Sequence, residues 1–199
     1  MRLFRKALIL AVVLMMLCTI TGFAGQCETI SDRVLRVHVL ANSDSQEDQA
    51  LKLKVRDKVL ECSAYMLDDA QDLNQAEALT EQNLQDIQKV AQEEVYRQGY
   101  DYPVKVELTN MHFNTRVYET VTLPAGEYDA LRVSIGEAQG HNWWCVMFPP
   151  MCLPAAEESK ELQDVLDPAQ IEIVEGGSQY EVKFKTIEVL EDIKSWFGQ

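Results

Sequence analysis

Residues 140–152 read G-H-N-W-W-C-V-M-F-P-P-M-C and contain two of the chain's three tryptophans. The aromatic and apolar run from Asn142 to Phe148 is typical of a β-strand, and Pro149 ends it because proline cannot donate a backbone hydrogen bond to a neighbouring strand. Consecutive side chains of a strand point to opposite faces, so Trp143 and Trp144 lie on different sides. Two interpretations follow: one indole is displayed as a recognition surface, or a two-layer fold covers both.

Upstream segments alternate between apolar and polar residues, which also predicts strands. In R-V-L-R-V-H-V-L (33–40), Val37 and Val39 share one face, whereas Arg36 and His38 share the other. Further strands are expected at 102–108 and 127–135, and the stretch 111–123 is strand-prone but irregular. Residues 136–140 form a tight connection, so 127–135 and 142–148 are predicted to pair as a hairpin.

Two long helices are predicted between the first and second strands. From Gln46 to Met66, apolar residues recur every three or four positions, as on the buried side of an amphipathic helix. The second helix extends from Gln75 to Gln98. Arg56 and three lysines lie on the outer side of the first helix, where nearby acidic residues favour a solvated, ion-paired face over a docking patch for an acidic partner.

The C-terminal part is predicted to contain a short helix within 154–167, a small hairpin formed by 171–174 and 180–184, and an amphipathic helix from Lys185 to Phe197. The predicted fold class is therefore α+β. It has a mainly antiparallel sheet of four or more strands, two long helices after the first strand, and a C-terminal hairpin and helix. Residues 25–199 are expected to form a single domain.

The first 24 residues have the pattern of a targeting segment. Arg2, Arg5 and Lys6 precede an apolar run, and the small residues Gly22 and Ala24 lie where a signal peptidase would cleave after position 24. The run is slightly short for a membrane span, which takes ~20 apolar residues. We expect export, with residues 1–24 acting either as a signal peptide or as an N-terminal membrane anchor, which is the expected contact with a membrane.

The charge of the chain argues against nucleic acid as a partner. The formal net charge is -14, and the first 24 residues contribute three positive charges and no negative ones, so the remainder carries -17. Such an acidic surface repels phosphate backbones.

Export would place Cys27, Cys62, Cys145 and Cys152 in a compartment where disulfides persist. Four cysteines allow three complete pairings, and the sequence does not choose between them. Cys145 and Cys152 flank the Pro-Pro pair and are our disulfide candidate. The alternative is that Cys62 and Cys145 are small buried hydrophobic residues.

The sequence predicts neither a metal site nor a cofactor, and we assign no catalytic residue. The three histidines are scattered, and neither a Walker A loop nor a dinucleotide-binding glycine pattern is present. An enzymatic alternative is a thiol-dependent hydrolase acting on cell-wall material, with Cys145 as nucleophile. His141 lies four residues before Cys145, which on a strand separates the two by ~13 Å, too far for direct proton transfer.

Several long blocks resemble the stage II sporulation protein R family. They are R-V-H-V-L-A-N-S-D-S-Q-E-D-Q-A-L-K-L-K-V-R-D-K-V-L (36–60), Y-P-V-K-V-E-L (102–108), T-R-V-Y (115–118), L-P-A-G-E-Y-D-A-L-R-V (123–133) and the segment 140–152. The resemblance extends in order from about residue 30 to 153, whereas the region after Leu153 is less diagnostic.

The resemblance implies a signalling role in endospore formation. Members of the family are made in the forespore and exported into the space between the forespore and mother-cell membranes. There they activate a membrane-embedded aspartic protease, stage II sporulation protein GA, which processes the precursor of sigma factor E. The family carries no catalytic residues to transfer. Our candidates for the partner-binding surface are His141, Asn142, Trp143, Trp144, Arg36 and Arg56.

Overall fold

A computed structural model describes residues 2–118, 121–151, 162–176, 180 and 183–189. It contains two compact units, which we describe separately. The first comprises residues 1–30, 112–127 and 168–199, and the second comprises residues 31–111 and 128–167.

A four-stranded sheet forms the centre of the second unit. Its strands are β1 (Leu35–Leu40), β2 (Val104–Phe113), β5 (Gly126–Ile135) and β6 (Asn142–Phe148), arranged in the order β2-β5-β1-β6. The inner strand β1 pairs in parallel with β5 and antiparallel with β6. All six residues of β1 are buried, so this strand lies in the core.

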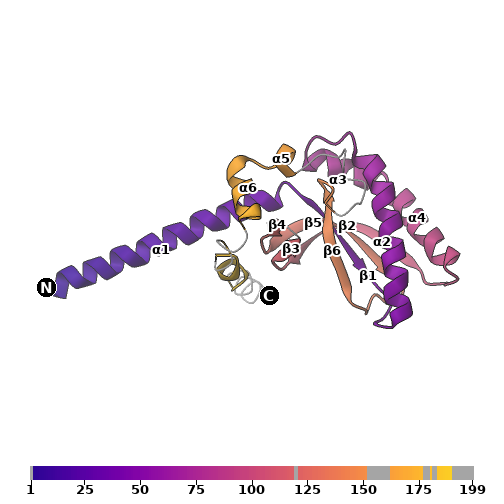
Figure 1. Ribbon diagram of the computed structural model, residues 1–199, viewed down its shortest axis with the longest axis horizontal. Coiled ribbons are helices and arrows are strands. Elements are labelled where there is room, and N and C mark those ends of the chain that lie inside the picture. Colours follow the sequence, from indigo (N-terminus) through magenta and orange to yellow (C-terminus); the bar gives the residue numbers. More distant parts are fainter. Residues whose placement is uncertain (1, 119–120, 152–161, 177–179, 181–182, 190–199) are drawn as a thin grey trace. The chain divides into compact units, whose positions relative to one another are not determined.

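Helices α2 (Gln46–Leu67) and α3 (Leu73–Gln82) pack on the sheet, and α4 (Leu84–Arg97) packs against α2 (Figure 1). Helix α2 begins at Ser45, whose side chain accepts a hydrogen bond from the Asp48 backbone N–H at 3.1 Å. Its apolar stripe, which includes Val55 and Val59, is buried. The predicted α+β class, with a four-stranded sheet and helices after the first strand, is confirmed.

Two predictions about this unit are wrong in detail. The helix expected at 75–98 is two helices, because the chain leaves helical geometry at Asn83 (φ -107°, ψ 9°). The strands β5 and β6 do not form a hairpin, because β1 lies between them. Their connection instead crosses the end of β1, where the Gln139 and Gly140 N–H groups donate to the carbonyls of Asn42 and Ala41.

The edge strand β2 is covered by α4. Gln88 and Gln92 of this helix accept hydrogen bonds from the backbone N–H groups of Val106 and Val104 at 3.1 and 2.8 Å. An uncovered edge would present these donors to another chain, so the two glutamines protect it from unwanted strand pairing.

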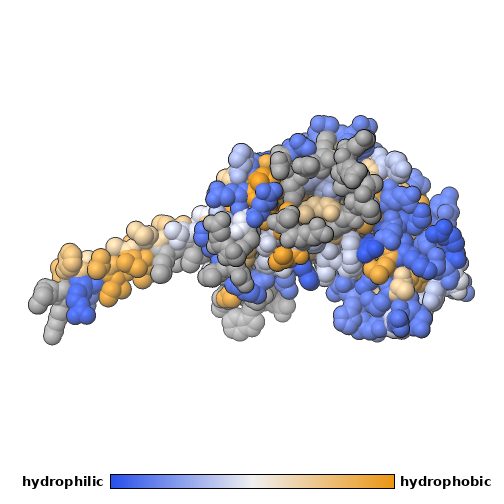
Figure 2. Space-filling model, viewed as in Figure 1, coloured by the Kyte–Doolittle hydropathy of each residue, from blue (hydrophilic) through white to orange (hydrophobic). Residues whose placement is uncertain are grey.

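Helix α1 (Arg2–Ser31) is the longest element of the first unit. Its early part exposes apolar side chains, among them Phe4, Ile9 and Met15, which form the hydrophobic stretch in Figure 2. Its later part is packed: the Phe23 ring is buried and stacks on Tyr180 with 5.8 Å between ring centroids. Within the described residues, no helix combines enough length with enough hydropathy to cross a membrane.

The remaining elements of the first unit are short. Strands β3 (Arg116–Tyr118) and β4 (Val121–Leu123) pair antiparallel, and helix α6 (Pro168–Glu175) packs against β4. Gln170 on α6 donates a hydrogen bond to the Thr29 hydroxyl of α1 at 3.1 Å.

The C-terminal hairpin prediction is wrong. Residues 171–174 belong to α6, and residues 183–189 are helical. A short apolar run fits a buried helix as well as a strand, and here the helix forms. Residues 183–189 confirm part of the helix expected at 185–197, and the rest of it lies outside the described residues. The short helix expected within 154–167 corresponds to α5 (Leu162–Val165) in the second unit.

Candidate functional site

Strand β6 passes from solvent into the core along its length. Asn142 is exposed, Trp143 and Trp144 are half-buried, and the residues from Cys145 to Phe148 are buried. Both indoles are therefore partly accessible, on opposite faces of the same edge strand.

Trp143 lies on the face of the sheet that the helices cover, which we call the helix face. Arg56 of α2 lies over its ring, with the guanidinium carbon 4.8 Å from the ring centroid. This is the geometry of a cation–π interaction. Arg56 also pairs with the neighbouring Asp57 at 2.6 Å, so it belongs to the ion-paired helix surface expected from the sequence as well.

Trp144 lies on the opposite side of the sheet, where it stacks on His38. The ring centroids are 3.6 Å apart and the planes are nearly parallel, at 7°. In the strand register, His38 aligns with Trp144 on one side and with Arg132 of β5 on the other. Arg132 in turn lies 3.9 Å from the Glu107 carboxylate of β2. We call this surface, formed by Glu107, Arg132, His38, Trp144 and the neighbouring Lys105, the Arg132 face.

His38 is neutral at physiological pH. Only 3% of its surface is exposed, and this burial, assisted by the positive charge of Arg132, lowers its pKa to about 4. The Asn142 side chain opposes the shift.

A hydrogen-bond network fixes the loop that precedes Trp143. The Asp48 carboxylate accepts from the Asn42 amide at 2.8 Å and the Ser43 hydroxyl at 2.6 Å. Burial would raise the pKa of Asp48, but these hydrogen bonds outweigh it and lower the pKa. The Asn42 side chain also accepts from the Glu137 N–H at 3.0 Å. The loop after β1 is thereby joined to the connection that leads into β6.

His141 takes part in the same junction. Its backbone N–H donates to Asp44 at 2.5 Å, and its ring Nδ1 contacts the same carboxylate oxygen. The hydrogen bond from the ring, followed by the one from the backbone, lowers the pKa of Asp44. The His141 carbonyl accepts from Lys52 Nζ at 2.8 Å, and burial lowers the pKa of this lysine. Lys52 thus ties helix α2 to the start of β6.

Gly140 is required by this close approach. A side chain there would bring its Cβ to 2.1 Å from the Ser43 carbonyl oxygen, so any other residue would force the two segments apart.

Five of the six candidate contact residues lie on or next to β6, but on both of its faces. His141 precedes the strand, Asn142, Trp143 and Trp144 belong to it, and Arg56 of α2 contacts Trp143 on the face opposite to Trp144. Arg36 is different. It is fully buried, with its guanidinium 4.8 Å from the Tyr128 ring centroid, so it is not part of the exposed surface. The sequence pattern placed Arg36 and His38 on the same face correctly, but did not reveal that β1 lies in the middle of the sheet.

Sequence reasoning missed Arg132, Lys105 and Glu107. Each occupies a polar position of an alternating strand, which predicts only that it faces away from the core side. The register that aligns Arg132 with His38, and His38 with Trp144, was the missing information.

The cysteines do not provide a nucleophile at this site. Cys145 is 1% exposed and disulfide-bonded, so it has no thiolate to offer. Cys152 lies outside the described residues, and its pairing with Cys145 stays a prediction. Cys18, Cys27 and Cys62 are free thiols, and burial raises the pKa of Cys27 to about 12. The alternative of a hydrolase that uses Cys145 therefore has no support here.

In the part of the chain that the structure describes, no group of three or more His, Cys, Asp or Glu side chains is placed to hold a metal ion. His38, His112 and His141 lie on separate elements or loops. What the arrangement offers chemically is two half-buried indoles on opposite faces of β6, each with an arginine on its own face, and tryptophan and arginine are residue types enriched in protein interfaces.

Comparison with known proteins identifies relatives. The family model described as stage II sporulation protein R matches residues 31–158, which include both helices α3 and α4 and the whole of β6. Stage II sporulation protein R of Bacillus subtilis (strain 168) is 34% identical over 143 residues, which cover 70% of this chain. The match spans 64% of that relative's length. No solved structure matches. The chain belongs to the stage II sporulation protein R family.

Proposed function

We propose that this chain is an exported signalling protein of endospore formation that activates the membrane-embedded aspartic protease stage II sporulation protein GA, and so starts processing of the sigma factor E precursor. Family membership carries the proposal and gives the chain a role in sporulation. The surface around β6 supports a role by contact, since it presents aromatic anchors and no activated thiol among the described residues.

Residues 1–24 direct export from the forespore into the space between the forespore and mother-cell membranes. The support is the basic start followed by apolar side chains exposed along α1 (Figure 2). Phe23 precedes the expected cleavage position and packs on Tyr180 and Phe184. Cleavage after Ala24 would remove this buried ring, so the packing favours a retained N-terminal anchor over a cleaved signal peptide.

The proposed mechanism is a shift of conformational population. An activator must bind the active arrangement of the protease more tightly than its resting arrangement, and the difference in binding free energy limits the activation. Large aromatic side chains on a rigid strand are suited to this, since they contribute contact area at small cost in conformational entropy. The junction at Gly140, Asp48 and Lys52 supplies that rigidity.

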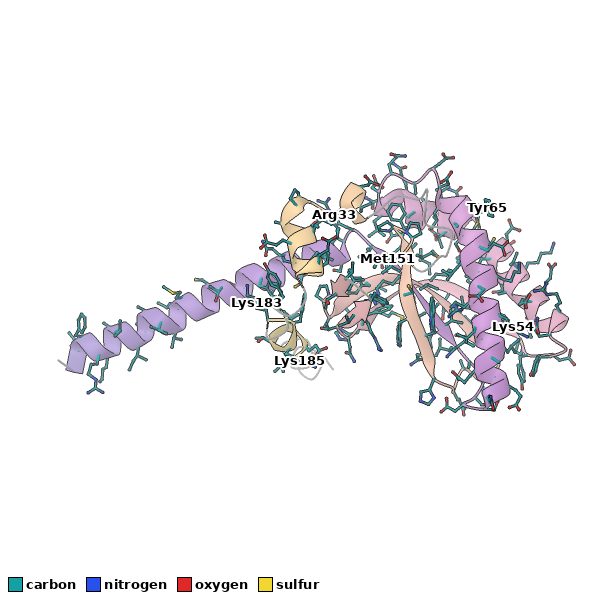
Figure 3. The ribbon with its side chains drawn as sticks, viewed as in Figure 1. Arg33, Lys54, Tyr65, Met151, Lys183 and Lys185 are labelled. Atoms are coloured by element: carbon teal, nitrogen blue, oxygen red, sulfur yellow. The ribbon has the colours of Figure 1, made fainter. Side chains whose placement is uncertain are left out.

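Removal of both indoles tests the proposal. A Trp143→Ala, Trp144→Ala double variant should still be exported and should abolish processing of the sigma factor E precursor in sporulating cells, measured by immunoblot. Tyr65→Ala is the matched control, because Tyr65 is an aromatic residue that is 82% exposed on α2 (Figure 3). Normal processing with a folded, exported double variant would refute the placement of the contact.

Reconstitution tests the function independently of the contact surface. Co-production of the chain, the protease and the sigma precursor in a non-sporulating host should yield processed sigma factor only when all three are present. Processing that is equally efficient without the chain would contradict an activating role.

A further inference from the structure

The Arg132 face forms one continuous row across all four strands of the sheet. Glu107 on β2, Arg132 on β5, His38 on β1 and Trp144 on β6 occupy neighbouring positions in the strand order. The helices lie on the other side, as the contact between Arg56 and Trp143 shows. Trp144 is half-buried and the Arg132 side chain is 39% exposed, so these two members of the row are accessible from solvent, whereas His38 is buried between them.

Arg132 has hydrogen-bond donors without a partner among the described residues. Its Nη1 is 3.9 Å from the Glu107 carboxylate, which exceeds hydrogen-bond distance, and its buried Nε has no partner among the described residues. A guanidinium offers five N–H donors in a planar fork that matches a carboxylate. Beside it, the buried His38 ring lies under Trp144. The exposed part of the Arg132 guanidinium is therefore the group that a partner molecule can reach.

The charges of the row define what that molecule carries. Lys105 pairs with Glu107 at 2.6 Å, and the same carboxylate is the one that lies near Arg132. One carboxylate therefore faces two cations, which leaves a local excess of positive charge in a chain with a net charge of -14. His38 is neutral and adds no charge. A molecule that fits this surface therefore carries a negative charge next to an apolar side chain.

We infer that the Arg132 face binds an acidic peptide segment of the partner protein, with a carboxylate held by Arg132 and an apolar side chain packed on Trp144. This inference rests on the proposed function and names the surface and the kind of segment by which the activator holds its target. His38 is a positioning residue, since it supports the Trp144 ring at 3.6 Å from beneath.

Site-specific photo-crosslinking of the full chain in sporulating cells tests this inference. Benzoylphenylalanine is introduced at Ser134, which lies on β5 two residues from Arg132 and therefore on the same face. The control position is Lys54, an exposed residue of α2 on the helix side (Figure 3). We expect crosslinking from position 134 to a segment that contains aspartate or glutamate, identified by mass spectrometry, and no such product from position 54.

Charge variants test whether Arg132 holds the acidic segment that is crosslinked from position 134. In the position-134 protein, Arg132→Glu should lower the crosslink yield at least about tenfold, because it replaces attraction by repulsion, and Arg132→Gln should lower it less. Lys54→Glu, a charge reversal of equal size on an exposed position of α2, should leave the yield within about twofold. Circular dichroism of each purified variant checks that it is folded.

The outcomes separate this inference from the proposed function. If Arg132→Glu retains both the crosslink and sigma-precursor processing, the inference is wrong while the activating role stands. A crosslink to a second copy of this chain, or to a segment without acidic residues, also overturns it. If the acidic segment belongs to a protein other than stage II sporulation protein GA, the inference holds and the proposed target is wrong.

Discussion

Trp143 and Trp144 are adjacent in the sequence but lie in different surroundings. On the helix face, Trp143 is next to a sheet surface that is buried by α2 and contacts one cation of that helix, Arg56. On the Arg132 face, Trp144 stacks on a buried neutral histidine and adjoins a row of charged side chains that are partly exposed. Trp143 is thus half-buried beside a helix residue, whereas Trp144 is half-buried on the His38 ring.

The difference shows which side is available to a partner. Arg56 already occupies the face of the Trp143 ring, and its own charge is paired with Asp57. Arg132 makes only a long ion contact among the described residues. An interface gains most where polar groups still lack partners and an aromatic ring is accessible, so the Arg132 face is the better docking surface.

The largest expected effect contrasts adjacent residues of β5. Leu131 is fully buried on the helix face, so Leu131→Ala should lower the free energy of unfolding by about 2–5 kcal/mol through lost burial and a cavity. Arg132→Ala on the other face should cost less than about 1 kcal/mol. Urea unfolding followed by circular dichroism measures both. Equal losses would mean that the Arg132 face is part of the core and not a surface open to a partner.

Sequence alone was sufficient to assign the faces of this sheet. Alternation separates Val37 from His38 and Trp143 from Trp144, and the structure keeps these assignments because one face must bury its apolar set. Alternation does not identify which strands are neighbours in the sheet. A β5–β6 hairpin and the observed insertion of β1 bury the same residues, so only the loop contacts around Asn42 and Gly140 distinguish them.

The site was harder to predict than the fold for the same reason. Arg132 reads as an ordinary solvent-facing residue until its strand is placed next to His38. Arg36 has the same pattern but lies over Tyr128, out of reach of solvent. The exposure of a polar residue on a strand depends on what packs over that end of the sheet, and no local sequence signal records it.

The second prediction concerns the pH dependence of stability. The pKa of His38 falls from 6.5 to about 4 on folding, so between these values the unfolded chain binds a proton that the folded chain does not. The contribution of His38 to the free energy of unfolding is therefore complete above pH 6.5. It is lost as the pH decreases to 4, which lowers the free energy of unfolding by about 3 kcal/mol. His38→Phe keeps an aromatic ring under Trp144 and removes the titration. Urea unfolding at pH 7 and pH 4 should show that the free energy of unfolding decreases less in the variant than in the natural protein.

Other groups also titrate in this range, so the measured quantity is the difference between the two proteins. A His38→Phe variant that loses as much stability as the natural protein between pH 7 and pH 4 would show that His38 is not held neutral by its burial beneath Trp144. The role of His38 as a buried, neutral support for Trp144 would then be incorrect.

The smallest expected effect concerns the interaction on the helix face. A double-mutant cycle with Arg56→Met and Trp143→Leu should give a coupling of about 0.5–1 kcal/mol in unfolding free energy, the range of an exposed or partly buried cation–π pair. Lys54→Met, also on α2, should show no coupling to Trp143→Leu. Because Arg56 is engaged within the chain, Arg56→Met should reduce processing of the sigma precursor far less than Arg132→Gln does. If instead Arg56→Met abolishes processing while folding is kept, the helix face is the contact surface, and the roles of the two indoles must be exchanged.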